Sequence, residues 1–153
     1  MSPLHLHEIS SRLDRAFETT ANVDDDEVKS HLARYLCVLT SGYLETAIKT
    51  ILRDYVYNRS TPYIHSYVIF STNNLTNLKS EKISDQLSHF CSEWKEKFDT
   101  TLTDEEKSSV NSVVANRNQI AHGQNSDVTY VRIKEWYKNI KHVILKVEQI
   151  VNS

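Results

Sequence analysis

Hydrophobic residues recur along this chain every three or four positions, which is the spacing of one face of an α-helix. The clearest stripe covers residues 25–57 and consists of Val28, Leu32, Tyr35, Leu36, Leu39, Tyr43, Ala47, Ile51 and Tyr55. The end of the chain carries another, which consists of Ile133, Trp136, Tyr137, Ile140, Val143, Ile144, Val147 and Ile150. These stripes predict long amphipathic helices that share a core.

Shorter helices are expected between the polar breaks. The first covers residues 3–20. Thr61-Pro62, an N-cap followed by a proline suited to the first turn, opens a helix that runs to about Asn74. One helix is expected from Ser80 to about Asp99, with a stripe made of Ile83, Leu87, Phe90, Trp94 and Phe98.

The last third of the chain carries clear helix boundaries. Residues 103–106 read Thr-Asp-Glu-Glu, which is a capping box at the start of a helix. That helix is expected to reach His122, with Gly123 as its left-handed cap. Ser126-Asp127 is expected to open the last helix. The chain is therefore predicted to be an all-α bundle of five or six helices, forming a single domain over residues 1–153.

Composition supports this fold class and narrows the function. The 153 residues include only two glycines and two prolines, too few for the turns of a many-stranded protein. Lys and Arg number 18 against 20 Asp and Glu, so the chain is close to neutral. A polybasic nucleic-acid coat is excluded, and any RNA contact must come from a local patch.

The sequence gives little support for a bound cofactor, a disulfide framework or a membrane-spanning segment. Cys37 and Cys91 are too few for a disulfide framework or a zinc site and are expected to be buried thiols. His5-Leu6-His7 offers two ligands near a terminus, a poor metal site, so no metal or cofactor is expected. No apolar run approaches the ~20 residues that a membrane span requires, and no signal peptide is visible. We expect a cytoplasmic protein without a membrane partner.

The most informative segment is residues 116–123, Asn-Arg-Asn-Gln-Ile-Ala-His-Gly. At about 100° per residue, Arg117 lies in the middle of an otherwise apolar arc, whose other members are Val110, Val113, Val114 and Ala121. A guanidinium is costly to bury unpaired. Its position predicts an interface or cleft in which Arg117 meets an anion.

RNA cleavage without a metal needs a base for the ribose 2′-hydroxyl, an acid for the departing 5′-oxygen and a cation near the developing phosphorane charge, and Arg117, Asn118 and His122 are of the types that can carry this chemistry. His122 can serve as base or acid, because its ordinary pKa lies near neutrality. Arg117 can grip two phosphate oxygens, and Asn118 can orient the histidine or the phosphate. On an ideal helix, Arg117 and His122 point about 140° apart. We therefore expect a twofold dimer packed along this helix, with the apolar residues beside Arg117 as the contact.

Two other interpretations of these residues remain open. Arg117 could form an ion pair with a buried acid such as Glu45, without catalysis. The tyrosines near the end of the long helix are expected in the core and at its rim, with base stacking as the alternative; they are Tyr55, Tyr57, Tyr63 and Tyr67.

The R-N-x-x-x-H pattern near a helix end resembles the HEPN superfamily (higher eukaryotes and prokaryotes nucleotide-binding). Residues 113–123, with their Ala-His-Gly ending, are similar to the RiboL-PSP-HEPN branch, and so is Leu-Thr-Ser-Gly-Tyr-Leu-Glu at residues 39–45. The resemblance covers roughly residues 28–150. It implies a metal-independent endoribonuclease that acts at a homodimer cleft, as a toxin of a toxin–antitoxin pair or a phage-defence effector.

The resemblance also assigns roles to individual residues. Arg117 and His122 match the catalytic pair, and Asn118 matches the polar residue after the arginine. Glu45 matches a carboxylate on the long helix that holds the motif in place. Asn116 is expected to support the motif from its position beside Arg117, as a hydrogen-bonding residue and not as a catalytic one. Some relatives carry a tyrosine two residues after the histidine, where a partner nucleotidyltransferase modifies it. This chain departs from that pattern, because Gln124 occupies the position. A cognate antitoxin or regulatory protein is expected as a partner.

Two further functions compete with the ribonuclease. Some members of the family have lost nuclease activity and bind a partner protein or a nucleotide instead, and this chain could be such a module. A helical adaptor without any site would explain the fold but not Arg117. Neither the RNA that is cut nor the identity of the partner follows from the sequence.

Overall fold

The computed structural model describes residues 3–153, with side chains from residue 5 on, and in that range it contains helices and loops but no strand. The all-α prediction is confirmed. The described part of the chain holds seven helices, one more than the upper expectation: α1 (Pro3–Ala21), α2 (Asp26–Tyr57), α3 (Pro62–Thr72), α4 (Ser80–Ser88), α5 (Ser92–Thr101), α6 (Asp104–Ala121) and α7 (Tyr130–Asn152).

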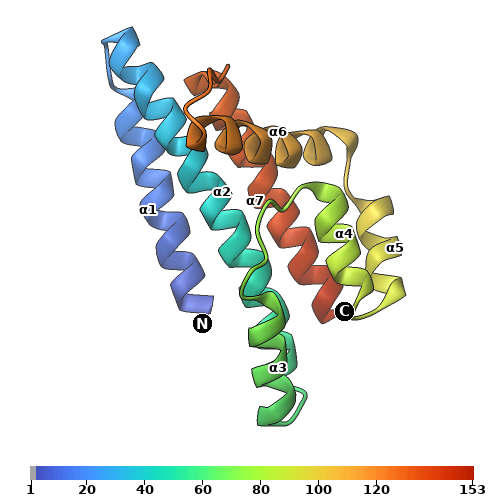
Figure 1. Ribbon diagram of the computed structural model, residues 1–153. Helices are drawn as coiled ribbons and strands as arrows, with labels where there is room; N and C mark the ends of the chain where they lie inside the picture. Colours follow the sequence, from blue (N-terminus) through green and yellow to red (C-terminus); the bar gives the residue numbers. More distant parts are fainter. Residues whose placement is uncertain (1–2) are drawn as a thin grey trace.

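Helix α2 is the central element of the fold. It packs against α1, α3, α6 and α7, and α6 crosses α2 and α7 (Figure 1). Leu44, Ile48 and Leu52 of α2 are fully buried, as are Ile133 and Ile140 of α7. The two long stripes that the sequence predicts therefore meet in the same core.

The helix starts follow the local chemistry of the chain. The Asp25 carboxylate accepts a hydrogen bond from the Val28 N–H (3.0 Å), and it caps α2. Thr61 caps α3 ahead of Pro62, as predicted. The predicted capping box of α6 is also confirmed, because Thr103 and Glu106 each accept the other's backbone N–H at 3.1 Å.

The single helix predicted for residues 80–99 is wrong, because the chain turns back after Ser88 to form α4 and α5. Ser84 donates a 2.6 Å hydrogen bond to Asp99, a residue that would lie about 22 Å away on one straight helix. Lys95 joins both side chains. Cys91 is extended (φ −162°) at the break. The hairpin buries Leu87 against the core, and no glycine or proline marks its turn.

The last helix begins later than predicted. Its N-cap is Thr129, whose hydroxyl accepts the Arg132 N–H at 3.2 Å, and not the expected Ser126-Asp127 pair. Ser126 is used elsewhere, because its hydroxyl donates to Asn116 of α6. A residue that could cap a helix instead fastens the loop between α6 and α7.

Helix α3 projects from the bundle and packs on α2 alone among the described helices (Figure 1). It buries Val68 and Thr72, whereas Tyr63 and Tyr67 are 87% and 69% exposed. Tyr57, at the end of α2, is 68% exposed. The expectation that these tyrosines belong to the core and its rim is therefore wrong for these three and holds only for Tyr55, whose ring packs on Trp94.

No helix in the described range combines the length and the apolar character that crossing a bilayer demands.

Candidate active site at the end of α6

The first three turns of α6 hold the helix in place. Val110, Val113 and Val114 are buried within the chain, and the Cys37 thiol of α2 donates to the Val113 carbonyl at 3.6 Å. On the α7 side, the Asn139 amide donates to Ser109 at 2.9 Å. The three valines in phase with Arg117 are therefore already covered by the same chain, whereas Ala121 is exposed. The expectation that the apolar residues beside Arg117 form the dimer contact is wrong for the valines and stays a prediction for Ala121.

Arg117 lies one turn beyond this buried part and is exposed. It continues the phase of the apolar arc, but α6 has left the core at this level. Its guanidinium Nη1 donates to the Asn118 side-chain oxygen at 3.3 Å. Among the described residues it forms no ion pair, so the alternative pair with Glu45 is absent. The guanidinium is free to meet an anion from solution.

His122 is the C-cap of α6, and Gly123 follows it in the left-handed conformation, as predicted (φ +67°). The Gly123 N–H donates to the Ile120 carbonyl at 3.1 Å, and the Gln124 N–H donates to Gln119 at 2.9 Å. This pair of bonds is a Schellman motif, which fixes the turn directly after the histidine. The His122 side chain is exposed, and its imidazole has no hydrogen-bond partner in the described part of the chain.

Asn116 supports this end of the helix from its partly buried side. Its amide nitrogen donates to the Ser112 carbonyl at 2.8 Å, and its amide oxygen accepts from the Ser126 hydroxyl at 2.9 Å. Ser126 also accepts the Val128 N–H at 3.4 Å. The loop that leaves His122 is thereby tied back to the helix that carries Arg117.

Glu45 lies elsewhere on α2 and fastens a different segment. Its carboxylate accepts the Asn77 N–H at 3.3 Å, in the loop between α3 and α4. The same loop reaches α6 at its end, where the Ser80 N–H donates to the Asn111 side chain at 2.9 Å. Glu45 thus has only an indirect connection to α6, and its support of the motif stays a prediction.

Arg34 is a further candidate for a functional residue, and the sequence pattern did not single it out. It lies one turn before Cys37 on α2, and its Nε is buried without a hydrogen-bond partner among the described residues. A buried donor of this kind is uncommon in folded proteins and is costly to leave unpaired. The sequence does contain a signal for Arg34. Like Arg117, it is a cation inside an apolar helical pattern.

The nearby thiol does not add a nucleophile to the site. Burial raises the pKa of Cys37 to about 12, so the thiol stays protonated near neutral pH. Cys91 is half-buried at the start of α5. The first is a buried thiol, as expected, and the second is only partly covered.

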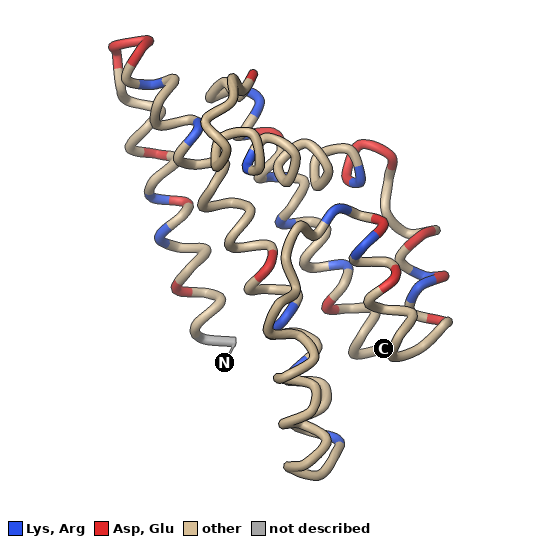
Figure 2. The backbone as a smooth tube through the Cα atoms, viewed as in Figure 1, with Lys and Arg blue, Asp and Glu red and all other residues tan. Residues whose placement is uncertain are grey.

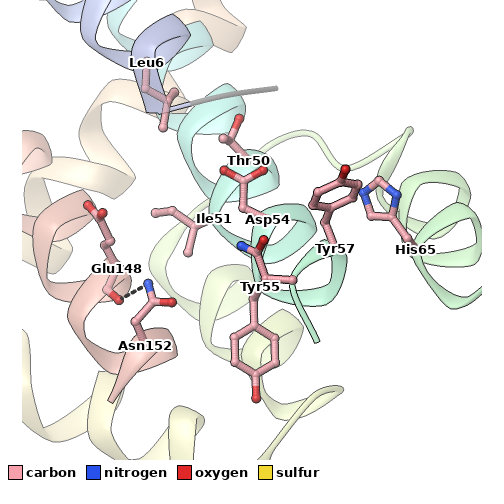
Figure 3. Close-up of a pocket in the computed structure, with 10 residues that line it drawn as sticks. Leu6, Thr50, Ile51, Asp54, Tyr55, Tyr57, His65, Glu148 and Asn152 are labelled. Atoms are coloured by element: carbon pink, nitrogen blue, oxygen red, sulfur yellow. Dashed lines mark hydrogen bonds between the residues drawn. The ribbon is translucent and has the colours of Figure 1, made fainter. Parts of the chain in front are cut away.

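A pocket of about 550 Å³ lies away from the motif, at the other end of α2 (Figure 3). Its walls include Leu6 of α1, Asp54 and Tyr57 of α2, His65 of α3 and Glu148 of α7. Burial raises the pKa of Asp54, and the charge of His65 opposes that shift. Two carboxyl groups on its walls do not suit a phosphate backbone. The exposed end of α6, with its arginine and histidine, suits one better.

The chain matches the RiboL-PSP-HEPN family over residues 6–153. It belongs to that family. The match takes in α6 together with Arg117, Asn118 and His122, and nearly the whole of the described structure. A search of curated proteins and a search of solved structures found no match to the chain. Membership of a HEPN family is consistent with a ribonuclease or a nucleotide-binding module.

Proposed function

We propose that this HEPN protein is a metal-independent endoribonuclease that cuts RNA at a homodimer cleft, as a toxin or a phage-defence effector. One observation carries the proposal. The end of α6 presents Arg117, Asn118 and His122 together, with the guanidinium unpaired by any described acid and the imidazole unbound. Groups without a structural partner on a firmly held helix end are available for a substrate.

The chemistry assigns one task to each residue. The 2′-hydroxyl of a ribose attacks the adjacent phosphorus, and His122 takes its proton as general base. The bond from phosphorus to the 5′-oxygen breaks, and a histidine acting as general acid protonates that oxygen. Arg117 stabilises the extra negative charge of the phosphorane, with Asn118 holding its Nη1. The products carry a 2′,3′-cyclic phosphate and a 5′-hydroxyl.

A second copy supplies what one chain lacks. Within one helix, Arg117 and His122 diverge by about 140°. A twofold axis near the end of α6 would place two arginines and two histidines around one phosphate, one histidine as base and the other as acid. RNA is then the substrate, and a cognate antitoxin or regulatory protein would cover the cleft when the enzyme must be silent.

The test is cleavage of a labelled single-stranded RNA in the presence of EDTA. Cleavage should occur there, and the matching DNA should stay intact because it lacks the 2′-hydroxyl. His122→Ala should reduce the rate by about 10²–10⁴-fold, the usual size of a lost acid–base group. His89→Ala, at an exposed histidine after α4, is the matched control and should cleave normally.

Growth of the expressing host provides an independent readout. A toxin should slow growth, and His122→Ala should restore it while His89→Ala should not. Cleavage that requires Mg²⁺, or that survives His122→Ala, would falsify the mechanism. A folded dimer that cuts no RNA would instead identify a nuclease-dead module, in which Arg117 binds a partner or a nucleotide.

A further inference from the structure

The guanidinium of Arg34 on α2 lies partly inside the protein without a structural partner. Its Nε is buried and meets no acceptor among the described residues, and none of the ion pairs within the described range includes it. The positions one turn away on α2 are residues 30, 31, 37 and 38, which are serine, histidine, cysteine and valine, so its own helix offers no acid. The arginine therefore has a charge and a donor to spare for an anion from outside the chain.

Helix α6 passes α2 in the direction of the start of α2. Early in α6, Asn111 is bonded to one end of the loop between α3 and α4, and Glu45 of α2 holds the same loop. Two residues further along α6, the Val113 carbonyl accepts from the Cys37 thiol. The neighbours of α6 on α2 thus move from the level of Glu45 to that of Cys37 as α6 proceeds.

The end of α6 lies at the level of Arg34. After α6 the chain reaches Tyr130 at the start of α7, and the Lys29 ammonium lies 4.9 Å from the centre of its ring. The turn of α6 that holds Arg117 therefore lies between the Cys37 and Lys29 levels of α2, and Arg34 belongs to that interval. Figure 1 shows the end of α6 beside the first half of α2.

Arg34 also lies on the correct flank of this crossing. Because the loop between α3 and α4 bonds both Glu45 and Asn111, these two side chains mark one flank. Arg34 comes eleven residues before Glu45, which places it about 20° away around α2. Asn118 comes seven residues after Asn111, which is also about 20° away around α6. Arg34 and Asn118 are therefore on the same flank, one on each helix.

The two helix stretches that meet here are free of acidic residues. Residues 29–44 and 107–126 contain no Asp or Glu, although the whole chain has 20 acids against 18 Lys and Arg. The cations and histidines of these stretches are Lys29, His31, Arg34, Lys107, Arg117 and His122. In Figure 2 the acidic positions of α6 lie at its start, at the opposite end from the motif. The local potential is therefore positive on a nearly neutral protein, which favours a polyanion at this place.

We infer that Arg34 binds the RNA backbone, at a phosphate next to the one that Arg117 holds. The inference rests on the proposed function, because it names a second contact of the same substrate. A guanidinium can bind two phosphate oxygens at once, and the bound phosphate supplies the acceptor that the chain does not. Arg34 takes no part in proton transfer. It is a substrate-binding residue that fixes how the strand lies across the end of α6.

Arg34→Met separates binding from folding, because it keeps an unbranched apolar stem and removes the charge. Its affinity for single-stranded RNA should fall by about 10-fold or more, the effect of losing a hydrogen bond to a charged group. Its urea midpoint should rise, because the variant no longer buries an unpaired donor. A merely structural arginine would give a lower midpoint with unchanged affinity. Arg34→Lys restores the charge without the planar fork and should regain part of the affinity.

Arg53→Met is the matched control on the same helix. Arg53 lies 19 residues further along α2, about 28 Å away. Its Nε donates to the Thr72 hydroxyl at 2.9 Å, and its Nη2 donates to the Ile69 carbonyl at 3.3 Å. This arginine has structural partners, so its loss should lower the urea midpoint and leave RNA affinity unchanged. Fluorescence anisotropy of a labelled RNA measures affinity, with His122→Ala in every protein so that the probe stays intact.

Two further measurements identify the contact as a phosphate. The slope of log affinity against log salt should decrease by about 0.7 in Arg34→Met, the value for one lost phosphate contact on a single strand. Replacing single phosphates of the probe by neutral methylphosphonates should weaken the Arg34-containing protein at a position beside the scissile one. Arg34→Met should be insensitive at that position alone. An unchanged salt slope, or equal sensitivity at every position, would overturn the inference.

The failures of the two proposals are distinguishable, because cleavage is measured separately with His122 intact. If the protein cuts RNA but Arg34→Met binds it as tightly as the unchanged chain, the ribonuclease stands and the role of Arg34 falls. If binding depends on Arg34 but no RNA is cut, the phosphate contact stands and the nuclease falls. A protein that neither binds nor cuts RNA overturns both.

Discussion

The amide oxygen of Asn116 accepts a hydrogen bond from the Ser126 hydroxyl, with 2.9 Å between the two atoms. This bond closes the loop that leaves His122 back onto α6. Gly123 sets the turn at the start of that loop, and Ser126 holds its far side. The position of His122 relative to Arg117 therefore depends on contacts outside the motif itself.

The effects of Asn116→Ala and Ser126→Ala on the free energy of unfolding should not be additive. Each should lower the free energy of unfolding by about 1 kcal/mol, the usual contribution of one hydrogen bond. Because both remove the same bond, the double variant should lose less than the sum of the single losses. Denaturant unfolding of the four proteins measures the coupling. Strict additivity would mean that the bond contributes nothing.

The two glycines of the chain should respond in opposite directions to alanine. Gly123 has a φ of +67°, and L-residues are strained there by about 1 kcal/mol or more, so Gly123→Ala should destabilise the protein. Gly42 lies inside α2, where alanine is the better helix former, so Gly42→Ala should stabilise it by up to about 1 kcal/mol. Thermal unfolding of both variants checks the signs. RNA cleavage should fall only for Gly123→Ala, because that change disturbs the turn after His122.

The fold was largely predictable because helix formation depends on local signals. The capping box at Thr103 and the left-handed Gly123 are each specified within a few residues, and both are confirmed. The turn between α4 and α5 was not, because it depends on Ser84 meeting Asp99 across a hairpin. Leu87 and Trp94 keep helical phase across the break, so periodicity alone cannot reveal it.

The sequence singles out the candidate site residues, but it does not predict what surrounds them. Arg117 shares the phase of Val110 and Val113, and phase does not tell where along α6 the core ends. The structure buries both valines and exposes the arginine. In the same way, Tyr35 belongs to the apolar stripe of α2 yet lies exposed, because no other helix in the described part of the chain covers it. Whether another helix packs over a residue depends on the tertiary structure, and the periodicity of the sequence does not predict it.

Glu106 should make stability depend on pH in the acidic range. Burial alone would raise its pKa, but hydrogen bonds from Lys146 (2.7 Å) and the Thr103 N–H lower it below the ordinary value of 4.5. A carboxyl whose pKa is lower in the folded state adds stability above its unfolded pKa. That stability is lost as the pH falls through the folded-state pKa.

Glu106→Gln should remove this contribution. At neutral pH the variant should lose about 1–3 kcal/mol of unfolding free energy, the range for hydrogen bonds to charged groups. The difference from wild type should shrink as the pH falls below 4.5, where Glu106 becomes protonated. Urea unfolding across the acidic range measures it. Glu105→Gln, at the exposed neighbouring position, is the control and should show no such trend.

The cleavage reaction should require the guanidinium group of Arg117 and not only its positive charge. Arg117→Ala should lower kcat by about 10²–10³-fold, the cost of removing a donor to developing negative charge. Arg117→Lys keeps the charge but loses the planar fork and its contact with Asn118, so it should recover only part of that rate. Because the residue is exposed, neither change should alter stability, and Arg12→Ala on α1 should affect neither the cleavage rate nor the stability.

Single-turnover cleavage with saturating enzyme separates the chemical step from binding. If only KM rises in Arg117→Ala, the arginine binds RNA without stabilising the transition state.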